Sequence, residues 1–446
     1  MKRIYLDHAA TTYLDPRVKA AMEPYWEIYF GNPSTLYKEG MEARNALTAS
    51  RKKIASLIGA NSDEIIFTNG GTESDNLAIF GVAKFFHPNY LFPSRLKPQG
   101  GSDADPENKQ FKGFGRFHII TSKIEHHAVL NPCEVLEKEG FRVTYLNVNK
   151  DGIVDLKELK KSLSKDTILV SIMYANNEIG TIQPIKEIAK IIRDFRNSKF
   201  EARSTKQIQN SKFKIQNKEV SDFGFRISDL TTYPLFHTDA IQAAGYLDLN
   251  VGKLGVDLMS VNASKIYGPK GIGFLYVKRG VKLSPVIYGG SQEKGLRPGT
   301  ENVPGIIGLS KAFEIAQNMR EKESRRLIAL RDYLIKGILK KIPNSSLNGC
   351  LMPRLPNNVN VTIDGVEGES LVLYLDARGI SCSTGSACTS SDLEPSHVIT
   401  ALGKSKEAGH CSVRFTLGRK TKKADIDYLL KVLPEVVKKL RNVSAI

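Results

Sequence analysis

Short apolar runs alternate with stretches of helical periodicity through the first two thirds of the chain. The apolar runs have the length and the flanking turn residues of buried strands. Helical patterns follow or separate several of them, at 72–86, 128–140 and 184–195. Strands that alternate with helices predict an α/β fold, a mainly parallel sheet with helices on both faces. The predicted strands cover 64–68, 117–122, 142–148, 167–175, 234–240, 257–263 and 271–277.

The last third of the chain has a different pattern. A long helix is predicted over 303–341, and two further strands are predicted over 357–363 and 412–418. Helical patterns at 368–379 and 422–443 separate and follow these strands. Few strands with long helices at the end of a chain predict a smaller α+β unit.

Because 446 residues exceed what one ordinary core supports, we expect two domains. The predicted large domain covers 15–315, and the predicted small domain combines 1–14 with 316–446. Two stretches, 88–115 and 197–232, lack a sustained period and are too long for ordinary connections, so we interpret them as loops or surface inserts. The second is rich in Lys and Arg, and a basic docking arm is the alternative.

The composition, 41% hydrophobic and 25% charged, is that of a globular protein, and the net charge of +17 raises the question of nucleic-acid binding. Lys and Arg are spread widely and no nucleic-acid-binding motif occurs, so direct binding is disfavoured. The five cysteines have scattered spacings, which disfavours a disulfide framework or a zinc ribbon and suits a reducing compartment. The start, MKRIYLDHAATT, lacks the apolar segment of a signal peptide, and no apolar run is long enough to span a membrane. We therefore expect a cytoplasmic protein.

A glycine pair follows the first predicted strand, in FTNGGTES. Gly70 and Gly71 would let the backbone approach a ligand closely, and Thr72 is a suitable N-cap for the next helix. Free N–H groups at such a helix start suit a phosphate. The spacing matches neither a Walker A loop nor a dinucleotide-binding fingerprint, and an ordinary strand–helix turn is the alternative.

Three further residues lie beside predicted strands. Asp239 ends an apolar run where an open α/β sheet usually binds its ligand, and could hold a proton on a ligand nitrogen or cap a helix. Lys265, in NASKIYGPKG, is a candidate Schiff-base amine or a solvated lysine. His126 could stack on a flat cofactor, and no third ligand at a suitable spacing makes it and His127 a metal site. A phosphate cradle, a carboxylate for a ring nitrogen and a lysine for an aldehyde are together what pyridoxal phosphate requires.

Cys388 lies in the stretch STGSACTSS, among small and polar residues that cannot bury it. Such a run is typical of an exposed loop, and an accessible thiol can be reactive. The alternative is an exposed thiol without a role.

The motifs together resemble those of the cysteine desulfurases, within the class V aminotransferase-like branch of the pyridoxal-phosphate enzymes. The matching stretches include YLDHAATT, FTNGGTESDNLAI, SKIYGPKGIG, GLRPGTENV and GSACTSSDLEPSHVI, and they cover almost the whole chain apart from the two inserts. The resemblance implies a fold type I pyridoxal-phosphate-dependent transferase, with a seven-stranded sheet in the large domain and the Cys388 loop in the small one. It also implies conversion of L-cysteine to L-alanine with a persulfide on Cys388, for iron–sulfur cluster assembly or tRNA thiolation. A selenocysteine lyase or another class V enzyme is the alternative.

The resemblance implies roles for the residues around the cofactor. Lys265 would bind pyridoxal phosphate covalently and move protons. His126 would stack on the ring and assist proton transfer. Asp239 would hold the proton of the ring nitrogen, and Gln242 would contact the ring hydroxyl group.

The resemblance also implies contacts to substrate and partners. Arg414 would pair with the substrate carboxylate, for which a guanidinium is well shaped, and Asn177 would lie at the cofactor or the substrate. Thr300 would reach the phosphate in a neighbouring subunit, which implies a homodimer with shared sites. A sulfur-acceptor protein would collect the sulfur from Cys388.

The phosphate would be held by Gly71 and Thr72, with further contacts just before Lys265. There the chain departs from the family pattern, because Asn262 and Ser264 stand where the family usually has Ser and His. Both can hydrogen-bond a phosphate, so we expect weaker or rearranged binding of the cofactor.

Overall fold

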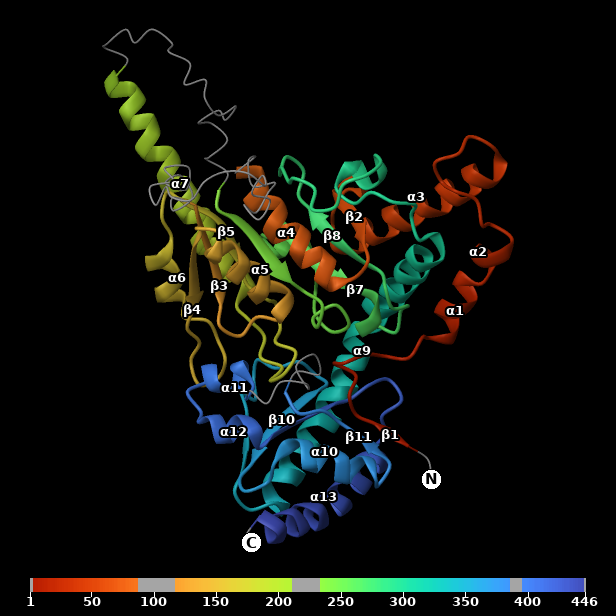
Figure 1. The fold of residues 1–446 in the computed structure, drawn as a ribbon, viewed down its shortest axis with the longest axis vertical. Coiled ribbons are helices and arrows are strands. Elements are labelled where there is room, and N and C mark those ends of the chain that lie inside the picture. The colour runs from red at the N-terminus through yellow and green to blue at the C-terminus, as the bar shows by residue number, and fades with distance from the viewer. Residues whose placement is uncertain (1–2, 87–116, 211–232, 386–394, 445–446) are drawn as a thin grey trace, which may run out of the picture.

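The computed structural model describes residues 3–86, 117–210, 233–385 and 395–444 of the chain (Figure 1). Its largest element is a seven-stranded sheet with the order β2-β8-β7-β6-β5-β3-β4. Strand β8 is antiparallel to both of its neighbours and the other pairs are parallel, so the predicted mainly parallel sheet is confirmed. The strands are β2 (Ile65–Thr68), β3 (His118–Ser122), β4 (Arg142–Leu146), β5 (Thr167–Ser171), β6 (Leu235–Asp239), β7 (Leu258–Asn262) and β8 (Gly273–Val277).

Both faces of this sheet are buried, because successive residues of a strand point to opposite faces. In β2, Ile65 and Phe67 belong to one apolar core and Ile66 belongs to the other. This double burial explains why the strands read as continuous apolar runs rather than as alternating patterns. The helices that contribute to the two cores include α3 (Lys38–Ile58), α6 (Leu156–Ser162) and α7 (Ile185–Asn210) on the first face, and α4 (Gly71–Phe86) and α5 (His127–Lys138) on the second.

Helix α7 corrects one prediction. The sequence predicts a loop or insert over 197–232, but α7 continues to Asn210, so the prediction is wrong for the first part of that stretch. Residues 196–210 contain no Gly or Pro and include the good helix formers Glu, Ala, Arg, Lys and Gln, so nothing ends the helix there. Residues 211–232 and the predicted insert 88–115 lie outside the described residues.

A three-stranded antiparallel sheet with the order β12-β10-β9 lies in the lower half of Figure 1, near both chain ends. Two of its strands confirm the predictions at 357–363 and 412–418. The third strand, and the short parallel pair of β1 with β11, contain too few residues to show a period. The elements of this part are β1 (Ile4–Tyr5), β9 (Ser345–Leu347), β10 (Asn358–Ile363), α10 (Gly368–Asp376), β11 (Ile380–Ser381), α11 (His397–Ala401), α12 (Lys406–His410), β12 (Ser412–Thr416) and α13 (Lys423–Ser444).

Helix α9 (Val303–Lys341) confirms the predicted long helix and links the two sheets. Phe313 packs into a core of the large sheet, whereas Ile338 packs into the core of the small one. The change of core falls between Ala316 and Leu327, close to the predicted domain boundary after residue 315. The division into two domains stays a prediction.

The remaining α-helices are short: α1 (Pro16–Met22), α2 (Pro24–Glu27) and α8 (Val251–Leu254). Within the described ranges, no helix combines the length and the apolar character needed to cross a bilayer.

Candidate active site

Several of the predicted site residues gather where strands β2, β3, β6 and β7 end. These strands point the same way, so their carboxyl ends lie at one edge of the sheet, the usual ligand crevice of an open α/β fold. Asp239 is the last residue of β6, Lys265 follows β7 and His126 follows β3. Burial is the main influence on the pKa of Asp239 and on that of His126, and the charge of Lys265 is a smaller influence on each.

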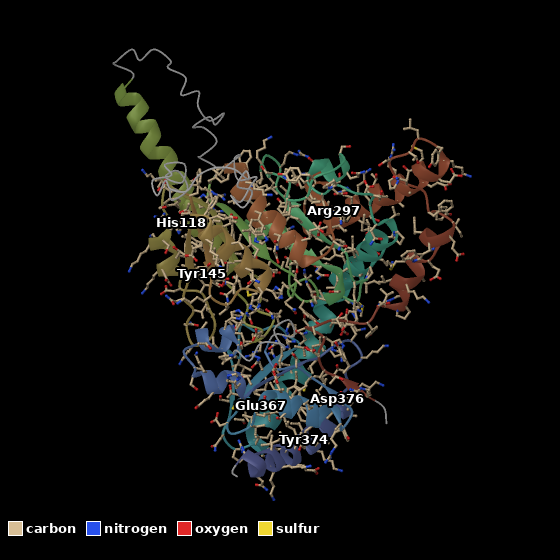
Figure 2. The ribbon with its side chains drawn as sticks, viewed as in Figure 1. His118, Tyr145, Arg297, Glu367, Tyr374 and Asp376 are labelled. Carbon is tan, nitrogen blue, oxygen red and sulfur yellow. The ribbon has the colours of Figure 1, made fainter. Side chains whose placement is uncertain are left out.

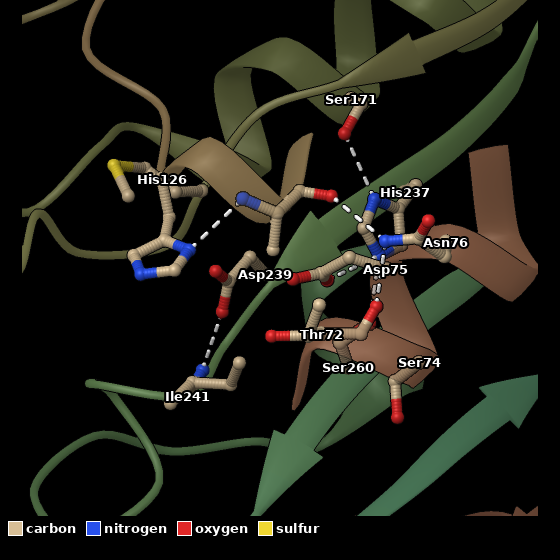
Figure 3. A network of polar contacts seen from close by, with 12 residues as sticks. Thr72, Ser74, Asp75, Asn76, His126, Ser171, His237, Asp239, Ile241 and Ser260 are labelled. Atoms are coloured by element: carbon tan, nitrogen blue, oxygen red, sulfur yellow. Dashed lines mark hydrogen bonds and ion pairs between the residues drawn. The ribbon is translucent and has the colours of Figure 1, made fainter. Parts of the chain in front are cut away.

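The Asp239 carboxyl group is buried, and burial raises its pKa to about 6 against the opposing effects of the Ile241 N–H and Lys265. Its Oδ1 accepts a hydrogen bond from the Ile241 N–H at 2.9 Å, so it caps the turn that follows β6. In Figure 3 the carboxyl group lies between His126 and Asp75. In this position it can hold a proton on the ring nitrogen of a flat ligand that lies against His126.

His126 is the N-cap of α5, and its Nδ1 accepts a hydrogen bond from the Ala128 N–H at 3.0 Å. Burial lowers the pKa of His126 to about 4. The ring is therefore neutral near pH 7, with its proton on Nε2, and it is held in one orientation. His127 packs instead against His397, with 4.8 Å between the ring centroids. In the ranges that the structure covers, no three His, Cys, Asp or Glu residues gather as metal ligands.

The N-terminal segment packs over the lysine. The Lys265 Nζ donates a hydrogen bond to the Ala10 carbonyl oxygen, and the Gln242 Nε2 donates to the Ala9 carbonyl oxygen at 3.1 Å. The segment therefore contacts both Lys265 and Gln242 through neighbouring carbonyl groups.

The glycine pair forms the start of α4. Gly70 has a φ of +132°, which an L side chain rarely adopts, and a Cβ at Gly71 would lie 2.1 Å from the Cδ1 of Ile241. The helix begins at Gly71, so the prediction that Thr72 is its N-cap is wrong; Thr72 is the exposed second residue of the helix. The Ser74 N–H makes the first intrahelical bond, to the Gly70 carbonyl oxygen. The N–H groups before it suit a phosphate.

Asn262 lies against the glycine pair. Its Oδ1 accepts a hydrogen bond from the Ser264 N–H at 2.9 Å, and a Cβ at Gly70 would lie 4.0 Å from its Nδ2. The Ser264 carbonyl oxygen accepts hydrogen bonds from the N–H and Oγ1 of Thr12 at 3.0 and 2.9 Å. The side-chain amide of Asn262 can therefore donate a hydrogen bond toward the phosphate site at the glycine pair. Asn262 thus still fits a phosphate group, although the family usually has Ser at this position.

Arg414, on β12, is buried, and its guanidinium makes two contacts. Its Nη2 lies 2.9 Å from Oδ1 of Asp7, and its Nη1 donates to the Asn177 carbonyl oxygen at 3.1 Å. The Arg414 Nε has no hydrogen-bond acceptor in the part of the chain that the structure describes. Burial raises the pKa of the Asp7 carboxyl group, while Arg414 and Lys265 lower it. Asp7 is a site residue that the sequence analysis missed, although it lies in the motif YLDHAATT.

One predicted residue, Thr300, is not brought into this cluster. Cys388 lies outside the described residues, but both flanks of its stretch meet at one buried acid. The Ser396 Oγ donates to Oε2 of Glu178 at 2.5 Å, and a Cβ at Gly385 would lie 2.7 Å from the same oxygen. Thr300 is exposed, on the segment before α9.

A buried polar network behind Asp239 was not predicted (Figure 3). His237 contacts Ser171 at 2.8 Å through Nδ1 and Ser260 at 3.0 Å through Nε2. The His237 Nε2 also lies 3.6 Å from an Asp75 carboxylate oxygen, and burial raises the pKa of Asp75 well above its usual value. The signal in the sequence was an acid at the start of the stretch DNLAIFGVA, which is apolar after Asn76, where helical spacing places Asp75 on the buried side.

Glu125, the buried residue just before His126, should make the free energy of unfolding of the cofactor-free protein fall as the pH rises. Burial raises the pKa of Glu125 to about 8 from a usual value of 4.5, so between these pH values the folded chain binds a proton that the unfolded chain has lost. The stabilisation is complete below about pH 4.5 and disappears as the pH passes about 8. Glu125→Gln should therefore reduce the fall in unfolding free energy by up to about 1.4 kcal/mol per pH unit, measured by urea unfolding between pH 5.5 and 8. The exposed Glu134→Gln is the control, and equal pH dependence of wild type and Glu125→Gln would contradict the assignment.

The description "Aminotransferase class-V" belongs to a family model that matches residues 4–90, 114–225 and 230–429. The chain is 48% identical to a protein named "Cysteine desulfurase IscS" from Dictyoglomus turgidum, with 100% of this chain and 97% of that protein covered. A protein with the same name from Methanosarcina thermophila is 47% identical, with 99% and 94% covered.

Solved structures agree with these sequence relatives. A structure titled "NIFS-LIKE PROTEIN" has a TM-score of 0.79 at 32% identity and covers 98% of this chain and 100% of its own. A NifS-like protein from Rickettsia africae has a TM-score of 0.75 at 28% identity, with 98% and 99% covered. The fold type I prediction is confirmed, and the chain belongs to the class V aminotransferase family, within its pyridoxal-phosphate-dependent cysteine desulfurases.

Proposed function

We propose that this chain converts L-cysteine to L-alanine and keeps the released sulfur as a persulfide on Cys388. The observation that carries the proposal is the buried Arg414 guanidinium, whose Nε has no acceptor among the described residues. A buried donor without an acceptor is costly, and the carboxylate of an amino-acid substrate would supply one. The relatives named cysteine desulfurase support L-cysteine as that amino acid.

The residues at the strand ends would hold the cofactor. Pyridoxal phosphate, when bound, supplies an electron sink for the substrate carbon. Lys265 would hold its aldehyde carbon, Asp239 would keep its ring nitrogen protonated, and the neutral His126 ring would stack on it. Gln242 would contact the ring hydroxyl group. The other contacts would come from Gly71, Thr72, Asn177, Asn262, Ser264 and, in the neighbouring subunit, Thr300.

The sulfur would pass directly from substrate to Cys388. The Cys388 thiolate would attack the sulfur of bound cysteine, so an S–S bond forms while the C–S bond of the substrate breaks. The electron pair of the C–S bond stays with the substrate carbon, to which Lys265 would deliver a proton to complete L-alanine. The contacts of Glu178 with Gly385 and Ser396 support this path, because Glu178 is next in sequence to Asn177, whose carbonyl group contacts Arg414.

The enzyme would act as a homodimer. An apolar patch, defined as Trp26, Ile28, Phe30, Leu36 and Tyr37, supports this, because each of these side chains is between 60% and 84% exposed in the single chain. Large apolar side chains exposed together in one short segment are typical of a protein–protein interface.

The sulfur would then leave Cys388 for an acceptor protein, in iron–sulfur cluster assembly or tRNA thiolation. Several of the relatives share the name IscS, which supports a common role in supplying sulfur. We place the enzyme in the cytoplasm, which the free thiols of Cys133, Cys350, Cys382 and Cys411 support, because such thiols persist in a reducing compartment.

Cys388→Ala tests the proposal. Wild type, loaded with pyridoxal phosphate and given L-cysteine and a reductant, should release alanine and sulfide in equal amounts. The variant should keep the absorbance of the bound cofactor but lose at least about 100-fold in both products, because it has no nucleophile for the sulfur.

Cys411→Ala, which changes a cysteine that is partly exposed, is the matched control and should keep full activity. Unchanged alanine release by Cys388→Ala would refute the persulfide route and favour another class V reaction.

A further inference from the structure

The segment between β8 and α9 contains an unusual turn. Glu293 and Lys294 have φ values of 46° and 61°, and Gly295 follows at 75°, so three successive residues adopt the left-handed conformation. This conformation is unfavourable for residues with a Cβ, and it persists only where the surroundings hold it. We call Gln292–Asn302, which contains this turn and Thr300, the arm.

Glu293 holds the turn through a buried ion pair. Its carboxylate binds the Arg51 guanidinium of α3 through both oxygens, with the Nη1–Oε2 contact at 2.7 Å, and it also accepts a hydrogen bond from the Phe67 N–H at 2.9 Å. The Arg51 Nη1 donates in addition to the Ile65 carbonyl oxygen at 2.6 Å. Strand β2 lies at the edge of the large sheet, so no further strand is hydrogen-bonded to its outer side. The Arg51–Glu293 pair instead bonds the Ile65 carbonyl oxygen and the Phe67 N–H of this strand.

Two more contacts fix the arm on either side of the turn. The Lys294 Nζ donates to the Asp63 carbonyl oxygen. The Arg297 Nε lies 3.0 Å from Oε1 of Glu73, in the first turn of α4 (Figure 2 labels Arg297 in the half that holds the large sheet). The arm is thus held from β2 to the start of α4, and it then presents Thr300 to solvent.

An exposed residue on a segment held at so many points is suited to a ligand outside its own chain. Sealing the edge of β2 would need the Arg51–Glu293 pair but no left-handed turn. The two residues Ile287 and Tyr288, just before the arm, are 46% and 60% exposed, so the arm emerges from apolar surface.

We propose that Glu293, held by Arg51, is a positioning residue that fixes the arm so that Thr300 reaches the cofactor phosphate bound by a second copy of the chain. The proposal rests on the proposed function, because it needs the shared site of the homodimer. Glu293 contacts neither substrate nor cofactor, and it acts on the partner's site rather than on its own.

Mixed dimers test the proposal. One chain carries Lys265→Ala, so that the absorbance of lysine-bound cofactor reports only the site built on Lys265 of the other chain. Glu293→Gln is placed either in the Lys265→Ala chain or in the reporting chain, and the dimer without cofactor is titrated with pyridoxal phosphate. We expect the affinity of the reporting site to fall about tenfold or more in the first arrangement and to stay unchanged in the second, since one hydrogen bond to a charged group is lost. A merely structural role would weaken the site in the variant's own chain.

Two controls sharpen the outcome. Glu314→Gln also removes an ion pair with α3, to Lys53 at 3.0 Å, and should leave both sites unchanged. Arg51→Lys keeps the positive charge but loses the two-point contact with Glu293. If Glu293→Gln does not fold, Arg51→Lys is tested in the same two dimer arrangements. Adding Thr300→Ala to a chain with Glu293→Gln should weaken the opposite site no further than Thr300→Ala alone.

An equal loss in both arrangements, a loss only in the variant's own chain, or no loss would each overturn the proposal. The wild-type dimer is assayed separately for desulfuration and for its mass in solution. A monomeric wild type would overturn the proposal as well, but would leave desulfuration to be judged by Cys388→Ala.

Discussion

Replacing Lys265 by alanine should lower the release of alanine from L-cysteine by about 10⁴-fold or more. The change removes both the amine that holds the cofactor and the group that delivers the proton, and each of these contributions is large. Alanine release is measured with saturating pyridoxal phosphate, so that weak binding alone does not explain the loss. Borohydride reduction of the loaded protein should add the mass of the reduced cofactor to wild type but not to Lys265→Ala.

Lys270→Ala is the matched control, because Lys270 is exposed and lies in the same glycine-rich turn. It should keep full activity and the added mass. If Lys265→Ala retained alanine release within tenfold of wild type, Lys265 would not be the amine at the centre of the site.

Replacing Arg414 by lysine should lower kcat/KM for L-cysteine by at least about 100-fold. Lysine keeps the positive charge near Asp7, but it cannot offer a planar fork to the substrate carboxylate, and hydrogen bonds to charged groups each contribute about 1.5–3 kcal/mol. The loss should come mainly from KM, since the carboxylate is bound in both ground state and transition state. The dissociation constant of pyridoxal phosphate should change little, because in the proposed site Arg414 would hold the substrate and not the cofactor.

Arg419→Lys is a suitable comparison, because Arg419 follows the same strand and pairs with Asp15 at 2.9 Å, away from the Asn177 contact. Its kcat/KM should stay close to wild type. A fall in kcat with an unchanged KM in Arg414→Lys would contradict carboxylate binding by the guanidinium.

The large sheet and its site could be read from the sequence for a physical reason. Strands buried on both faces carry continuous apolar runs, and the ligand crevice lies at their carboxyl ends, so Asp239 and Lys265 could be located from the runs before them. The Cys388 stretch stood out because small polar residues surround a thiol. These signals come from residues that are neighbours in the sequence, so they can be recognised without knowledge of the fold.

The features that were missed depend on contacts between distant parts of the chain. No residue close to Asp7 in the sequence indicates that it pairs with Arg414, and no residue close to Glu293 indicates that it pairs with Arg51. The start of α4 shifted by one residue because a glycine pair can begin a helix without a side-chain cap, which displaced Thr72 from the predicted N-cap. Helix α7 extends beyond its predicted end because residues 196–210 lack the Gly and Pro that would end it, whereas the prediction followed the absence of a sustained period there.

The pairing of Asp7 with Arg414 also bears on when the enzyme can be assembled. The two residues are 407 positions apart, and Lys265 meets Ala10 across 255 positions. Arg414 leaves the ribosome long after the strands of the large sheet have been made. Contacts of such high sequence separation form late in folding. A nascent chain therefore holds the glycine cradle and Lys265 before it holds the substrate site, and activity can begin only after β12 has been released and has met the first residues of the chain.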